Sequence, residues 1–130
     1  MDLPCFFSGR VHQGYQQGRL FGLPTANIHI SRRVPLIEGV YVGYTQISPE
    51  FVMHPSLLFW GRPHALPLVV DPRLEVHILS SDIGELYQKL LGVTIIDFLR
   101  ENGVFPDEES LREAMVKDVR RAKEYFNLVL

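Results

Sequence analysis

A glycine-rich segment near the amino terminus is the first candidate for chemistry. Gly9, Gly14, Gly18 and Gly22 fall within fourteen residues, and Arg19 lies among them. Glycine has no Cβ, so backbone N–H groups can turn toward an anion, and an arginine can add charge to a phosphate oxygen. The segment lacks the Gly-Lys-Ser/Thr of a Walker A loop, and no helix pattern follows it as in a Rossmann fingerprint. Taken alone, a set of tight turns is the simpler explanation of these glycines.

A short polar stretch, Pro24-Thr25-Ala26-Asn27, follows the glycines directly. In an extended segment the side chains of Thr25 and Asn27 project to the same side. A hydroxyl and an amide carbonyl are hard oxygen ligands, and Mg²⁺ takes one or two of these from a protein beside phosphates and water. The stretch therefore predicts a metal–phosphate contact. The alternative is that both side chains satisfy the backbone of a turn.

Glu75 is the candidate general base. In the segment 74–79, Leu74 and Val76 fall on one face of a predicted strand, whereas Glu75 and His77 fall on the other. A carboxylate inside a small barrel would be costly to bury without a purpose. The alternative is a surface-facing Glu75 that has a cross-strand partner. His77 points the same way, and we interpret it as a structural histidine or a partner for the carboxylate.

The composition is that of a soluble globular protein. The 130 residues carry a formal net charge of −2 and are 46% hydrophobic, with a pI of about 6.2, so the cationic excess that favours nucleic acid is absent. The single cysteine, Cys5, predicts a reducing compartment and a small buried hydrophobe. No signal-peptide pattern and no apolar run of the roughly 20 residues that span a membrane occur. We therefore expect one cytoplasmic, monomeric domain over residues 1–130 that binds neither membrane nor nucleic acid.

The elements that must position these residues are mostly short strands. Runs of β-branched and aromatic residues between Gly and Pro turns predict strands at 6–11, 27–30, 40–47, 56–60, 74–79 and 93–99. This is the pattern of an antiparallel barrel or sandwich. Phe59 and Trp60 are both expected in its core, and the alternative is that their rings stack on a ligand. From 107 to 128 the chain lacks Pro and Gly, and its apolar spacing predicts one amphipathic helix against the barrel, with Asp107 as the candidate cap. The predicted apolar stripe is Leu111, Met115, Val119, Ala122 and Phe126.

Taken together, these motifs resemble the riboflavin kinase family. The segment 22–27 is similar to its Gly-x-Pro-Thr-Ala-Asn signature, and Gly14 and Arg19 stand where the loop of that signature has a glycine and a basic residue. About fifty residues later, 75–79 resembles the family's Glu-x-His-Ile/Leu strand. Weaker matches in the family's order extend the resemblance over nearly the whole chain, at 35–41, 61–63, 86–87 and 99–105.

The resemblance implies a mainly β fold, a six-stranded antiparallel Greek-key barrel with a C-terminal amphipathic helix. It implies an enzyme that uses ATP and Mg²⁺ to phosphorylate the ribityl 5′-hydroxyl of riboflavin, which gives FMN and ADP. Such phosphoryl transfer depends on alignment and charge neutralisation, with one carboxylate taking the hydroxyl proton. By motif position, the base would be Glu75, the metal ligands Thr25 and Asn27, the nucleotide contacts Gly14, Arg19, Thr25, Asn27, Ser80 and Tyr87, and the flavin contacts Arg100 and Phe105.

Three features depart from the family pattern. Gln88 follows Tyr87 where the family has Gly, Gln16 and Gln17 occupy the loop where a further Gly is common, and 51–71 matches poorly. These departures concern the shape of the nucleotide pocket, and they leave open a catalytically degenerate flavin- or nucleotide-binding barrel module. A second alternative is a barrel that binds protein or single-stranded nucleic acid. Such a barrel would need an exposed basic and aromatic face, which a pI of about 6.2 does not favour. Many bacterial relatives carry an adenylyltransferase domain ahead of the kinase, and FAD synthesis is not predicted for these 130 residues.

Overall fold

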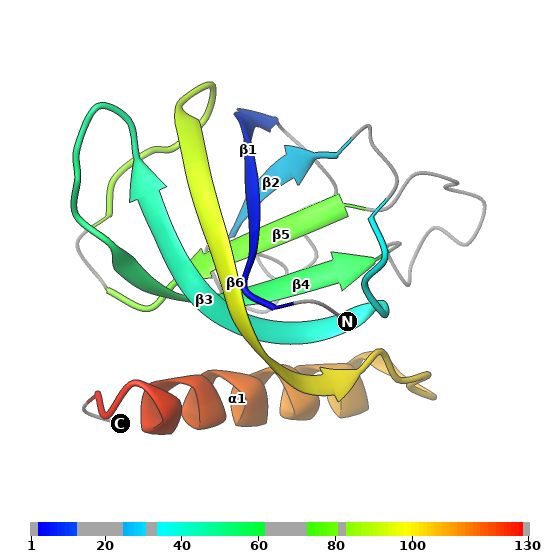
Figure 1. Ribbon diagram of the computed structural model, residues 1–130. Helices are drawn as coiled ribbons and strands as arrows, with labels where there is room; N and C mark the ends of the chain where they lie inside the picture. The colour runs from blue at the N-terminus through cyan, green and yellow to red at the C-terminus, as the bar shows by residue number, and fades with distance from the viewer. Residues whose placement is uncertain (1–2, 13–24, 31–33, 62–72, 81–82, 129–130) are drawn as a thin grey trace.

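The computed structural model describes residues 3–12, 25–30, 34–61, 73–80 and 83–128. It contains a closed barrel of antiparallel strands with a helix packed on its outside (Figure 1). The elements, in chain order, are β1 (Cys5–His12), β2 (Ala26–His29), β3 (Gly39–Ile47), β4 (His54–Gly61), β5 (Arg73–Ile78), β6 (Leu90–Glu101) and α1 (Glu108–Tyr125).

The strand order around the barrel is β1-β2-β5-β4-β3-β6, and β6 closes the barrel by pairing with β1. β3, β4 and β5 are consecutive neighbours, and β2 lies beside β5, which is the Greek-key arrangement. The predicted six-stranded Greek-key barrel is therefore confirmed. β3 and β6 contain register shifts next to Val40 and Val42, and such irregularities bend strands around a small barrel.

Apolar side chains from all six strands fill the barrel interior. Phe7, Ile28, Tyr41 and Leu74 are buried there, together with Trp60, as the sequence predicted. The same prediction was wrong for Phe59, which packs on the outer face against α1 because neighbouring residues of β4 alternate between the two faces. The Trp60 and Phe7 rings stack with their centroids 5.9 Å apart. Each interior residue alternates with an outward one along its strand. Because the interior is packed, polar chemistry has to take place on the outer face or at the ends of the barrel.

The helix α1 covers one part of that outer face, beneath β3, β4 and β6 (Figure 1). Met115 and Ala122 are its buried apolar residues. Asp107 caps its start, as predicted, by accepting a hydrogen bond from the Ser110 backbone N–H at 2.8 Å. This bond lowers the pKa of Asp107 below its usual value. Among the described residues, no helix combines the length and the apolar character that a membrane span requires.

The predicted element boundaries differ from the observed ones mainly at β4 and β6, which begin earlier than the sequence suggested. Cys5 starts β1 and packs against the core, but it is only partly buried. The expectation of a small buried hydrophobe near the first strand is therefore confirmed only in part.

Candidate functional site

A row of side chains crosses the outer face of the barrel, and the strand registers define it. Residues paired directly across two strands share a face of the sheet. The outer row, as we name it, comprises His12, Asn27, Glu75, Phe59, Val40 and Arg100, in order from β1 through β2, β5, β4 and β3 to β6. Since neighbouring strands lie about 4.8 Å apart, Arg100 is roughly 14 Å from Glu75 across the strands, and Phe59 and Val40 between them pack against α1.

Asn27 and Glu75 lie directly opposite each other on β2 and β5. Their neighbours Ala26 and Val76 point into the core, so alternation turns both polar side chains outward. Of the two placements that the sequence left open for Glu75, the structure has the outward one, with the residue half-buried. The predicted base and a predicted metal ligand, separated by about fifty residues in the chain, therefore lie side by side.

Thr25 and Asn27 present buried polar atoms. Thr25 Oγ1 and Asn27 Nδ2 are shielded from solvent, and neither has a hydrogen-bond partner in the part of the chain that the structure describes. An unsatisfied buried donor costs about 1–3 kcal/mol, and rotation of the amide can place either its nitrogen or its oxygen at the same point. These two atoms therefore make no hydrogen bond to the described backbone, although such bonds were expected if the side chains served only to stabilise a turn. They suit a site that is completed by a polar ligand.

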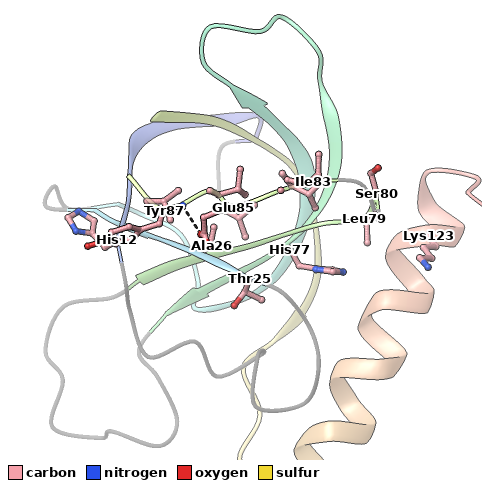
Figure 2. Close-up of a pocket in the computed structure, with 15 residues that line it drawn as sticks. His12, Thr25, Ala26, His77, Leu79, Ser80, Ile83, Glu85, Tyr87 and Lys123 are labelled. Atoms are coloured by element: carbon pink, nitrogen blue, oxygen red, sulfur yellow. Dashed lines mark hydrogen bonds between the residues drawn. The ribbon is translucent and has the colours of Figure 1, made fainter. Parts of the chain in front are cut away.

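A cavity of about 550 Å³ opens beside this end of the outer row. Thr25, Ser80 and Tyr87, which were predicted as nucleotide contacts, all line it (Figure 2). His77 lines it too and is only 8% exposed. In Figure 2 its ring points toward α1, from which Lys123 reaches the same cavity. The cavity therefore lies between the strand ends, the segment after β5 and the last turn of the helix.

A tight turn holds Tyr87 at the cavity edge. The Lys89 N–H donates to the Leu86 carbonyl at 2.9 Å, and Gln88 has a φ of 67°, as the third residue of a type II turn requires. The Gln88 N–H donates to the Val11 carbonyl at 3.0 Å. Gln88, one of the departures from the family pattern, thus adopts the left-handed conformation that glycine favours.

At the far end of the outer row, Arg100 makes a two-pronged ion pair with Asp118 of α1. Its Nε and Nη2 donate to the two carboxylate oxygens at 2.8 and 2.7 Å. Phe105, the other predicted flavin contact, has its ring centroid 5.7 Å from the guanidinium carbon. The two residues predicted to meet the flavin are therefore in contact with each other, on the opposite side of Glu75 from the cavity.

Comparisons with known proteins identify the family of the chain. The family model described as riboflavin kinase matches residues 1–126. The chain belongs to the riboflavin kinase family. It is 33% identical over 97% of its length to a "Bifunctional riboflavin kinase/FMN adenylyltransferase" of Buchnera aphidicola subsp. Schizaphis graminum, of which it spans 40%. It is 28% identical over 98% of its length to the "Riboflavin kinase" of Mus musculus, of which it spans 84%.

Two solved structures share the fold of this riboflavin kinase family member. One is titled as a macrolide-efflux protein from Streptococcus pneumoniae, with a TM-score of 0.75 and 23% identity over 92% of this chain and 38% of that one. The other is a riboflavin kinase from Trypanosoma brucei, with a TM-score of 0.67 and 19% identity over 94% of this chain and 76% of that one. The chain spans about two fifths of the bacterial bifunctional relatives it matches.

The structure describes all but two of the predicted site residues. Gly14 and Arg19 lie outside the described residues. Sequence reasoning missed Asp118 and Lys123 because both belong to a helix that was analysed only for its apolar stripe. The helical spacing held a signal for Asp118, which lies three residues after Met115 and four before Ala122, on the buried face.

Proposed function

We propose that this chain is a riboflavin kinase, which transfers the γ-phosphate of ATP to the ribityl 5′-hydroxyl of riboflavin and releases FMN and ADP. The observation that carries the proposal is the pairing of Asn27 with Glu75 beside the cavity. It brings candidate metal and phosphate ligands next to a candidate base, which is the arrangement that phosphoryl transfer needs. The family to which the chain belongs supports the same reaction.

The cavity is the proposed nucleotide site. Its lining by Thr25, Ser80 and Tyr87 supports this assignment, and its volume of about 550 Å³ lies within the usual range for small-molecule sites. Lys123 adds a cation at the helix side, where it can offset phosphate charge. Gly14 and Arg19 are assigned to the same site from their place in the motif.

Thr25 and Asn27 are the proposed holders of Mg²⁺. Their unsatisfied buried atoms and their hydroxyl and amide chemistry fit a hard cation bound chiefly by phosphates and water. When bound, the metal would neutralise charge on the transferring phosphoryl group. The contribution of the chain is to hold the two side chains on one face of β2, one strand away from Glu75.

Glu75 is the proposed general base. The ribityl oxygen attacks the γ-phosphorus, the bond from that phosphorus to the β–γ bridging oxygen breaks, and the hydroxyl proton passes to the Glu75 carboxylate. The ring system of riboflavin is assigned to Arg100 and Phe105 from the motif. Because Val40 and Phe59, which lie between Arg100 and Glu75 in the outer row, pack against α1, the ribityl chain would have to reach Glu75 past the edge of the helix.

Incubation of the chain with riboflavin, ATP and Mg²⁺, followed by chromatography, tests the proposal. FMN and ADP formed in equal amounts would support the kinase. Riboflavin binding without FMN would instead favour the catalytically degenerate binding module, and neither binding nor turnover would contradict both. The cytoplasmic location, the monomeric state and the single-domain organisation stay predictions from the sequence.

A further inference from the structure

Asp118 is a buried carboxylate that the proposed chemistry does not use. It lies in the middle of α1 and is 1% exposed. Both of its oxygens accept hydrogen bonds from Arg100, whose Nη1 also donates to the Glu101 carbonyl at 3.1 Å. With Phe105 beside the guanidinium group, all three nitrogens and the plane of Arg100 are fixed by the protein.

Attachment of the helix does not by itself account for this ion pair. Met115 and Ala122 flank Asp118 on the same buried face, and Ala122, with Val119 and Phe126, attaches α1 through apolar contacts. A buried ion pair loses about as much in desolvation as it gains in attraction, and an apolar pair of similar volume often stabilises a fold equally well. What the pair adds is a defined geometry, because a bidentate arginine–carboxylate contact fixes both distance and plane.

The ion pair fixes the geometry of the far end of the outer row, where Arg100 lies. Arg100 ends this row on β6, and Phe105 lies in the short segment between β6 and the cap of α1. The ring of Phe105 lies within cation–π range of the guanidinium group that Asp118 clamps. Movement of Asp118 would therefore shift the guanidinium group against which the ring of Phe105 lies.

We propose that Asp118 is a positioning residue for the flavin. By clamping Arg100, it holds the aromatic ring of Phe105 in place against the isoalloxazine system, at the end of the row opposite Asn27. The inference rests on the proposed function. It also refines the role of Arg100: three of its five N–H donors are engaged by Asp118 and the Glu101 carbonyl, so the ion pair sets the orientation in which the guanidinium plane and its remaining donors can meet the flavin.

The test compares Asp118→Asn with Met115→Ala, a matched control one helical turn earlier on the same buried face. Both variants should lower the Tm. Asp118→Asn should raise the KM for riboflavin roughly tenfold or more, because a charge-assisted contact is lost, while leaving the KM for ATP unchanged. Met115→Ala should leave both constants unchanged. An unchanged riboflavin KM in Asp118→Asn, or equal increases of both constants in both variants, would overturn the inference.

A paired substitution covers the case in which Asp118→Asn does not fold. Arg100→Met combined with Asp118→Leu replaces the ion pair by an apolar one, so the fold should keep or exceed its Tm. Riboflavin affinity, measured by flavin fluorescence without ATP, should nevertheless fall as in Asp118→Asn. Wild-type affinity in this stable double variant would show that the pair has only a structural role.

Hydrogen exchange separates failure of this inference from failure of the kinase proposal. Asp118→Asn should speed exchange of the amides at 102–105 selectively, whereas Met115→Ala should not, and neither measurement needs a substrate. If the wild-type chain makes no FMN but this selective effect is found, the kinase proposal fails and the positioning of Phe105 stands. If exchange at 102–105 changes equally in both variants, the positioning role is refuted whatever the activity.

Discussion

Replacement of Glu75 by glutamine is the sharpest perturbation of the proposed chemistry. The amide keeps the shape of the side chain but cannot accept the hydroxyl proton. Glu75 faces outward between Asn27 and Phe59 and belongs to neither apolar cluster. The substitution therefore removes no apolar burial, and the variant should keep its fold.

The expected loss of rate follows from the setting of the carboxylate. Positioned bases contribute typically about 10²- to 10⁴-fold. Because Glu75 is half-buried on an outer face rather than enclosed, water can take over part of its role in the variant. We therefore expect kcat to fall about 10²- to 10³-fold, which is roughly 3–4 kcal/mol in activation free energy. The KM for ATP should not change, since the cavity lining is untouched.

The assay is FMN formation followed by chromatography under single-turnover and steady-state conditions, with the Tm of each variant measured in parallel. Asp97→Asn is the matched control, because Asp97 is an exposed acid within β6, paired with Val42 rather than with a member of the outer row. It should leave kcat within twofold of wild type. A kcat for Glu75→Gln within fivefold of wild type, at unchanged Tm, would remove Glu75 from the role of base.

Three further outcomes are expected. Thr25→Val removes an unsatisfied buried hydroxyl, so the Tm should be kept or raised while the Mg²⁺ concentration for half-maximal rate rises roughly tenfold; an unchanged metal requirement would contradict the ligand assignment. Gln88→Gly should raise the stability by up to about 1 kcal/mol in denaturant unfolding, because it relieves a φ of 67°, whereas Gln88→Ala should not. Asp107→Ala should lower the Tm above pH 4. The folded pKa of Asp107 lies below its usual 3.8, so this carboxylate stabilises the fold above that value, and the difference from wild type should shrink as the pH falls through the folded pKa. A pH-independent difference would refute the charge on the cap as its cause.

The residue pattern was enough to predict the strands and the helix. The order in which the strands pair was predicted only through the family resemblance. Alternation in 74–79 was enough to put Leu74 and Glu75 on opposite faces of a strand, as the structure confirms. The capping of α1 by Asp107 was also readable, because it depends on residues three apart. The register between β2 and β5 depends on how the whole barrel closes, and no local pattern carries that information.

The Arg100–Asp118 ion pair could not be predicted from the sequence for a different reason. An aspartate within an amphipathic helix is usually solvated, and most of the charged residues of α1 lie off the buried face. Asp118 is buried because Arg100 meets it from β6, eighteen residues earlier in the chain. The partner that makes the burial tolerable belongs to another element, so the residue could be assigned a role only once the helix was placed against the barrel.

The barrel explains why the proposed site lies on its outer face. Six short strands enclose an interior just wide enough for their own side chains, and here Phe7 and Trp60 stack within it. A ligand the size of riboflavin has no room inside, and the middle of the outer row is covered as well, because Val40 and Phe59 pack against α1. Polar chemistry is therefore confined to the parts of the outer face on either side of the helix, where strand pairing provides a stiff, hydrogen-bonded surface. Chemistry that depends on alignment gains from such a surface, because the separation of Asn27 from Glu75 is held by strand pairing rather than by loops.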